Sequence, residues 1–314
     1  MNQKLLSIVL LSFQSESRLE NTSKLIIDAM EKESIPFELL IIDDGSSDQS
    51  YPKAKEIAQK DQRITAYRLS RNYTSPYVQF AGIKLAKGAC IVTVPDDLQR
   101  PLNVIIKMYR HWEAGAKLVV AYHDVRNDGY FNDFFSNSYY KMMNRFSDIE
   151  FPPGGADGFL ADREVMDIIN DEISPRNTTP LIEALRLGFE PEYFAYKRPP
   201  TVGKSRWTFK KKWRLASDSF FSSSNFPIKF IIGIGFTTAL ISFLIIVIII
   251  GAKLFSNNRL FGLPIQGWAT IVVLISFFNG LVLLCLGIVA EYIWRIYTEV
   301  KSRPGYIIRK NDEE

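Results

Sequence analysis

Two long apolar runs near the carboxyl end constrain this chain more than any other feature of its sequence. Phe230–Ala252 and Trp268–Ala290 contain no charged side chain. Each run has about 23 residues and reaches about 34 Å as a helix, which exceeds the ~30 Å hydrocarbon core of a bilayer. Buried core helices are the alternative, but two such runs joined by one short polar loop are rare in soluble domains. The sequence therefore predicts two transmembrane helices within residues 229–291.

Basic residues predict how these helices are oriented. They are concentrated before the first run and after the second, and few lie between the runs. Cytoplasmic segments carry the excess of lysine and arginine, so we expect a multi-pass protein of the inner (cytoplasmic) membrane with both termini and the preceding domain in the cytoplasm. The residues are Lys204, Arg206, Lys210, Lys211, Lys212, Arg214 and Lys229 before, Lys253 and Arg259 between, and Arg295, Lys301, Arg303, Arg309 and Lys310 after.

The chain is expected to divide into four parts. Residues 1–207 form a cytoplasmic domain, and residues 292–314 form a cytoplasmic tail after the transmembrane region 229–291. Residues 208–228 mix basic and aromatic side chains, which indicates a juxtamembrane amphipathic helix lying on anionic headgroups. A solvated basic linker is the alternative for this segment. The net charge of +4 is too small to predict a nucleic-acid partner.

The amino-terminal domain alternates strand-like and helix-like patterns. This rhythm predicts an α/β fold with a mainly parallel, Rossmann-like sheet, whose ligands bind beyond the carboxyl ends of the strands. The expected strands are Leu5–Ser12, Phe37–Asp43, Ile64–Leu69, Cys90–Val94 and Leu118–His123. The expected helices are Ser17–Glu33, Gln49–Gln62, Pro76–Lys87 and Pro101–Ala114.

Polar clusters follow three of the expected strands. They are Asp43-Asp44, Arg71-Asn72 and Asp96-Asp97. No glycine-rich loop for a dinucleotide or a nucleoside triphosphate follows the first strand. Carboxylates that hold a divalent cation could neutralise the phosphates of a nucleotide instead.

Short motifs occur in order along nearly the whole chain. They are Ser7-Ile8-Val9-Leu10 with Phe13 and Glu16, Ile41–Asp48, Ser70-Arg71-Asn72, Asp97-Leu98-Gln99 with Pro101, Asp157, Asp162-Arg163, Gly203–Trp207, and the block from Gly287 to Pro304. In this combination the chain resembles the polyprenyl-phosphate glycosyltransferases of glycosyltransferase family 2. The last block is the most specific motif, whereas Asp-Asp-Gly-Ser marks only the broader family.

The resemblance implies a GT-A nucleotide-sugar domain, an inverting mechanism and Mg²⁺ or Mn²⁺ as cofactor. It implies a nucleotide sugar, most simply a UDP-sugar, as donor and a polyprenyl phosphate such as undecaprenyl phosphate as acceptor. The product would serve the modification of an envelope glycan, and a homo-tetramer is expected because the family includes tetramers.

The resemblance also assigns roles to individual residues. Asp97, Asp157 and Arg206 would be catalytic, and Asp97, with Asp96 as a second candidate, would bind the metal. The nucleotide sugar would contact Phe13, Glu16, Asp43, Asp44, Arg71, Asn72 and Asp96. The acceptor phosphate would contact Lys204, Ser205, Arg206 and Trp207.

The chemistry of these residues suits glycosyl transfer, although simpler roles stay open. Guanidinium groups bind phosphate in a bidentate fork, so Arg206 fits an acceptor phosphate that arrives at the membrane. It and Lys204 could instead be membrane-surface residues, and Arg71 and Asn72 could be strand-end caps. Asp157 lies in a proline- and glycine-rich stretch that predicts a loop, where an aspartate is often a turn former.

The chain departs from the family pattern in its expected donor site. Pro95 stands where the family has the first aspartate of Asp-x-Asp, and Tyr73-Thr74-Ser75-Pro76 replaces Phe-Gly-Lys-Glu. Gly158-Phe159 stands where Phe-Arg is common. Three outcomes are open for the metal: Asp96 replaces the missing ligand, Asp97 holds the metal with the diphosphate and water, or the metal dependence is weak. A catalytically degenerate scaffold is the alternative function, followed by a processive or protein-directed transferase.

Overall fold

The structure is a computed structural model, and the chain in it divides into two compact units. Residues 1–223 with 304–314 form the first unit, and residues 224–303 form the second. The described residues are 4–123, 138, 140–141, 143–145, 149–152, 155–197, 226–255, 259–260, 263–264, 268–301 and 303–309.

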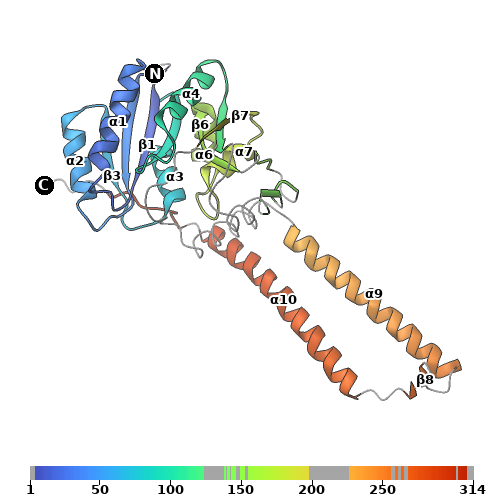
Figure 1. The fold of residues 1–314 in the computed structure, drawn as a ribbon. Coiled ribbons are helices and arrows are strands. Elements are labelled where there is room, and N and C mark those ends of the chain that lie inside the picture. Colours follow the sequence, from blue (N-terminus) through green and yellow to red (C-terminus); the bar gives the residue numbers. More distant parts are fainter. Residues whose placement is uncertain are drawn as a thin grey trace. The chain divides into compact units, whose positions relative to one another are not determined.

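The first unit is built around a seven-stranded sheet with helices packed on it (Figure 1). Its strands are β1 (Leu6–Ser12), β2 (Phe37–Asp43), β3 (Ile64–Arg68), β4 (Cys90–Pro95), β5 (Leu118–His123), β6 (Ala156–Asp162) and β7 (Pro191–Tyr196). Its helices are α1 (Leu19–Lys32), α2 (Ser50–Lys60), α3 (Ser75–Leu85), α4 (Leu102–Glu113), α6 (Arg163–Glu172) and α7 (Pro180–Arg186). The five strands and four helices expected before residue 124 are therefore present, with ends shifted by at most two residues.

The sheet is mixed rather than wholly parallel. Its strand order is β3-β2-β1-β4-β6-β5-β7. The pairs β1–β2, β1–β4, β2–β3 and β5–β7 are parallel, whereas β6 runs antiparallel to both β4 and β5. The α/β architecture agrees with the sequence prediction. The insertion of β6 between β4 and β5 was not predicted.

Strand β6 corrects one prediction directly. Asp157 was expected in a loop, but it is the second residue of β6. The stretch before it is rich in proline and glycine, and that local signal hid a strand whose hydrogen bonds go to β4 and β5. Pairing with strands distant in sequence decides whether such a segment forms a strand or a loop, because β propensity depends strongly on tertiary context.

The alternation of side chains along β1 divides the core into two layers. Ile8 and Leu10 face one side of the sheet and pack with α1, α2 and α4. Val9 points to the other side and packs with α3, α6 and α7. Successive residues of a strand face opposite sides, so a continuous apolar run such as that in β1 indicates a strand covered on both faces.

The second unit contains two long helices, α9 (Phe226–Phe255) and α10 (Trp268–Val300), and the short paired strands β8 (Arg259–Leu260) and β9 (Leu263–Pro264). The two predicted apolar runs lie inside α9 and α10, although α10 continues to Val300. Among the described residues, one helical segment, Phe277–Val300, is long and apolar enough to cross a membrane by length and composition.

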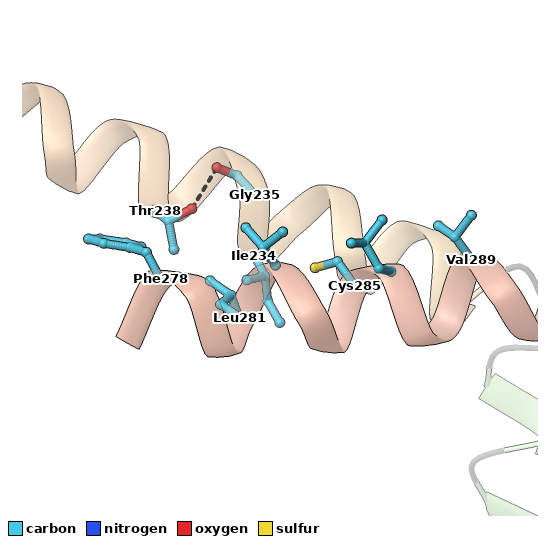
Figure 2. Close-up of a pocket in the computed structure, with 9 residues that line it drawn as sticks. Ile234, Gly235, Thr238, Phe278, Leu281, Cys285 and Val289 are labelled. Carbon is cyan, nitrogen blue, oxygen red and sulfur yellow. Dashed lines mark hydrogen bonds between the residues drawn. The ribbon is translucent and has the colours of Figure 1, made fainter. Parts of the chain in front are cut away.

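Apolar side chains cover the outside of both helices. Phe236 is 71% exposed and Leu283 is 68% exposed. Between the helices lies a groove of about 240 Å³, lined by apolar and small residues that include Gly235, Thr238 and Cys285. Figure 2 shows Thr238 of α9 donating its hydroxyl to the carbonyl oxygen of Gly235 (2.9 Å), which satisfies that polar group within its own helix. Such a surface is suited to an apolar surrounding.

The expected juxtamembrane helix lies largely outside the described residues, because residues 198–225 are not among them.

Gly82 offers a test of how closely α3 packs on the sheet. A Cβ atom at residue 82 would lie 2.1 Å from Cγ1 of Val9. Gly82→Ala should therefore lower the free energy of unfolding by about 1–3 kcal/mol through overpacking. Thermal unfolding of the detergent-solubilised protein measures this change.

The double variant Val9→Ala/Gly82→Ala is the matched control, because it removes the methyl group that the new side chain meets. The two substitutions should be strongly non-additive. Additive losses would contradict the packing described here.

Candidate active site at the sheet edge

Those predicted site residues that the structure describes lie toward one edge of the sheet. The parallel strands β1, β2, β3 and β4 end there, and antiparallel β6 begins there. In the register of β4 with β6, Cys90 pairs with Asp162 and Val92 with Leu160. The start of β6, with Asp157, therefore lies at the same edge as the loop that follows β4.

The Asp43–Ser46 turn is held by close packing and by an ion pair. Gly45 has φ +66°, and a Cβ atom there would lie 2.5 Å from the carbonyl carbon of Arg71. The backbone amide of Ser46 donates to Oδ2 of Asp43 (3.0 Å), and Nε of Arg68 lies 3.3 Å from that oxygen. Only glycine fits this position at low cost, which explains the Asp-Asp-Gly-Ser motif in physical terms.

Asp43 and Asp44 are both buried, and burial raises both pKa values. The amide of Ser46 and the charge of Arg68 partly offset the rise for Asp43. The pKa of Asp44 rises to about 6. Its Oδ1 accepts a hydrogen bond from the amide of Tyr73 (2.7 Å) and its Oδ2 accepts one from the amide of Thr74 (3.0 Å). Asp44 thereby fixes the loop between β3 and α3.

The loop after β1 is tied to the loop after β2. The amide of Gln14 donates to the hydroxyl oxygen of Ser46 (2.9 Å), and the amide of Glu16 donates to Oδ2 of Asp48 (3.3 Å). Phe13 is partly buried and Glu16 is exposed at this edge. Two expected donor contacts therefore stand beside the Asp43–Asp44 pair.

Asp96 and Asp97 differ sharply in their surroundings. Asp96 is 5% exposed, and its Oδ2 accepts from Nε (3.0 Å) and Nη2 (2.8 Å) of Arg18 and from the hydroxyl of Ser15. Asp97 is exposed, and Nε2 of Gln99 donates to its Oδ2 (2.5 Å). Arg18 and Ser15 thus engage Oδ2 of Asp96, whereas the side chain of Asp97 faces solvent.

Asp157 is held by a buried arginine that the sequence analysis did not single out. Arg100 is 4% exposed, and its Nε lies 3.6 Å from Oδ2 of Asp157. Its Nη2 donates to the backbone oxygen of Asp157 (3.2 Å), and the hydroxyl of Tyr196 donates to Oδ2 of Asp157. A Cβ atom at Gly158 would lie 1.6 Å from Nη2 of Arg100. Gly158 therefore makes room for the guanidinium.

Two sequence signals could have pointed to Arg100. It follows Asp97-Leu98-Gln99 directly, and Gly158 departs from the family pattern. Arg18 and Tyr196 were also missed, and no local pattern marks them, because their partners lie far away in the sequence.

The remaining predicted residues are placed in part. Arg71 and Asn72 are exposed in the loop after β3, and the guanidinium of Arg71 lies over the ring of Tyr73 at 4.2 Å. Lys204, Ser205, Arg206 and Trp207 lie outside the described residues. Within the described part of the chain, no group of three or more His, Cys, Asp or Glu side chains is arranged to hold a metal ion.

Comparison with known proteins identifies the family of this chain. Residues 7–168 match the sequence family described as glycosyl transferase family 2. The chain belongs to glycosyltransferase family 2. It is therefore a glycosyltransferase with a GT-A-like α/β domain.

Relatives match over almost the whole length. The SfII prophage-derived bactoprenol glucosyl transferase of Shigella flexneri is 31% identical, with 98% of each chain covered. The uncharacterized glycosyltransferase YkcC of Bacillus subtilis is 30% identical, covering 97% of this chain and 93% of the relative. Glucosyl-3-phosphoglycerate synthase from Mycobacterium tuberculosis, solved with Mn²⁺, UDP-glucose and phosphoglyceric acid, is 15% identical with a TM-score of 0.46, covering 68% and 76% of the chains.

The pKa of Asp44 predicts a pH-dependent stability. Between its ordinary value of 3.8 and about 6, the folded protein holds a proton that the unfolded chain has lost. The stability contributed by this group is present below about pH 4 and is lost as the pH rises through 6. Relative to Asp44→Asn, the wild type should lose about 3 kcal/mol between these limits. Unfolding curves from pH 4 to 7.5 measure the difference, and parallel pH profiles would contradict it.

Arg100 should be required for a rapid reaction. Arg100→Met removes the positive charge beside Asp157 and the hydrogen bond to its backbone oxygen, and should lower kcat by about 100-fold if this carboxylate faces the reacting groups. Arg100→Lys keeps the charge but not the planar set of donors, so it should recover part of the loss. Steady-state kinetics measure both variants, and an unchanged kcat in Arg100→Met would refute the role.

Proposed function

We propose that this glycosyltransferase transfers a sugar from a nucleoside diphosphate sugar, most simply a UDP-sugar, to a polyprenyl phosphate with inversion at the anomeric carbon. The observation that carries the proposal is the single sheet edge at which the carboxylates of Asp44, Asp97 and Asp157 stand on adjacent loops and strands. Relatives named bactoprenol glucosyl transferases, matched along 98% of this chain, support the lipid acceptor. The product is a lipid-linked monosaccharide that can supply the modification of an envelope glycan.

The nucleotide is assigned to the loops after β1, β2 and β3. Asp43 and Asp44 lie on the turn where the base would bind, and Phe13 and Glu16 flank that turn. Arg71 and Asn72 are exposed beside it and can reach an anionic or hydroxyl-bearing part of the donor.

The donor set at Asp97 fits a divalent cation held by one carboxylate, the diphosphate and water. Mg²⁺ retains several waters and is often bound through one or two carboxylates plus phosphates. When bound, Mg²⁺ or Mn²⁺ offsets the negative charge that develops on the departing diphosphate. Asp96 serves instead as the structural partner of Arg18, which orients the backbone from which Asp97 projects.

The acceptor phosphate is already an anion, so positioning matters more than proton removal. A phosphate oxygen of the lipid forms the new bond to the anomeric carbon. The bond from that carbon to the nucleoside diphosphate breaks at the same time, and the departing diphosphate keeps the electron pair. Asp157, which contacts Arg100 and Tyr196, is proposed to orient the sugar or the attacking oxygen. Lys204, Ser205, Arg206 and Trp207 are proposed to bind the lipid phosphate.

The topology of the chain supports two membrane spans. Residues 304–309 belong to the same compact unit as the sheet domain, although α9 and α10 lie between them in sequence. A chain that leaves this unit and returns to it must cross a membrane an even number of times. If the apolar segment in α10 crosses, α9 supplies the second crossing. We therefore propose a multi-pass protein of the inner (cytoplasmic) membrane, with both termini and the active site on the cytoplasmic side, and a homo-tetramer as its assembly.

Transfer to lipid tests the proposal. Membranes containing the full-length protein, incubated with undecaprenyl phosphate and a panel of labelled nucleotide sugars, should give lipid-linked label with at least one donor. Asp97→Asn should lower kcat by about 100-fold or more, because it weakens the binding of the cation that offsets the charge of the departing diphosphate. Asp28→Asn, an exposed change on α1, is the matched control and should be fully active.

No lipid-linked label with any donor would contradict the lipid acceptor. Nucleotide binding without transfer would instead favour the catalytically degenerate scaffold.

A further inference from the structure

The segment that follows α10 pairs with the sheet. The amide of Ser70 donates to the backbone oxygen of Ile307 (2.9 Å), and the amide of Arg309 donates to the backbone oxygen of Arg68 (2.8 Å). Leu69 and Ile308 form an antiparallel bridge between these hydrogen bonds. We call residues 304–309 the tail strand. It adds a single bridge to the sheet just after the end of β3, which is an edge strand.

Side-chain packing fixes the tail strand in one register. Tyr306 and Ile308 pack against the apolar cluster on the α3 and α6 side of the sheet. Burial raises the pKa of Tyr306 to about 12, so its phenol stays neutral. A Cβ atom at Gly305 would lie 2.7 Å from Cγ of Pro175, so glycine lets the backbone approach closely. Ile307 and Arg309 alternate outward and are exposed, as a strand with one covered face requires.

The tail strand touches the element that builds the donor site. Ser70, whose amide donates to the tail strand, begins the loop that carries Arg71 and Asn72. The same loop presents the amides of Tyr73 and Thr74 to the carboxylate of Asp44. The hydroxyl groups of Ser70 and Tyr73 are also hydrogen-bonded (2.9 Å). The chain of contacts therefore runs from the tail strand through Ser70 to Asp44.

We propose that the tail strand positions the donor-binding loop 70–74, so that affinity for a nucleoside diphosphate depends on the carboxyl end of the chain. The proposal rests on the proposed function of this edge. Residues 301–303 join the tail strand directly to α10, so the donor loop is linked through one short connection to a helix of the other unit. The tail strand is a positioning element and touches no reacting atom.

Arg309→Pro is the direct test, because proline removes the amide that donates to Arg68 and fixes φ at this residue, while the exposed side chain contributes little. In the full-length protein with Mg²⁺, Kd for UDP, measured by calorimetry, should rise by about 3- to 10-fold, the effect of losing one hydrogen bond. The donor KM should rise likewise with kcat little changed. Arg309→Ala keeps the amide and is the matched control, so its Kd should equal that of the wild type.

Hydrogen exchange separates positioning from general destabilisation. In Arg309→Pro the amides of residues 70–74 should exchange faster, while those of α4, on the opposite face of the sheet, stay protected. An unchanged Kd and unchanged exchange in residues 70–74 would overturn the proposal, and so would faster exchange of equal size throughout the domain. If Arg309→Pro does not fold, Ile308→Ser, which weakens the apolar contact, is measured by the same two criteria.

The failure of this inference is distinct from the failure of the proposed function. If the wild type binds none of the nucleoside diphosphates tested, including UDP and GDP, the proposed donor site fails. If the wild type binds UDP and Arg309→Pro binds it equally well with an unchanged loop, only the role of the tail strand fails.

Discussion

The parallel pairing of β1 with β2 on one side and β4 on the other sets the geometry of the whole catalytic domain. Because these strands run in register, from Leu6–Phe37 to Ser12–Asp43, their carboxyl ends stop at one line. The loops that leave this line must lie side by side, and their polar residues meet there. Apolar side chains on both faces of β1 make this pairing the centre of the fold, since helices then cover the sheet on both sides.

Ion pairs, each with one buried partner, organise the site that grows from this edge. Arg68 with Asp43, Arg18 with Asp96, and Arg100 with Asp157 each place a guanidinium against a carboxylate close to the strand ends. Removing one partner of such a pair leaves the other charge uncompensated, so the two residues of each pair depend on one another. They also separate two kinds of aspartate: those held in ion pairs and, at Asp97, one that faces outward.

Much of the fold could be predicted because it is encoded locally. Apolar runs of strand length and helical periodicity located β1 to β5 and α1 to α4, and the charge-free runs located α9 and α10. Strand β6 could not be predicted in this way. Its pairing partners β4 and β5 lie more than thirty residues earlier, and the prolines and glycines before Asp157 indicate a loop. The tail strand has the same character, because its hydrogen bonds reach back more than 200 residues.

The sequence predicted charged residues for the proposed site but not the residues that hold them. Motifs pointed to Asp44, Asp97 and Asp157, whereas Arg18, which pairs with Asp96 and not with Asp97, became visible only in three dimensions. Because Pro95 stands where the family has its first aspartate, the sequence alone left open whether Asp96 or Asp97 would bind the metal. We propose Asp97 as the ligand, because Arg18 and Ser15 occupy a carboxylate oxygen of Asp96.

The most direct test of this account is a crystal structure of the full-length protein with UDP and Mn²⁺, with the ion located by its anomalous scattering. The account predicts one manganese peak between the carboxylate of Asp97 and the diphosphate, with the base against the Asp43–Asp44 turn. A peak coordinated by Asp96 with Arg18 displaced, or a nucleotide bound away from this sheet edge, would contradict it.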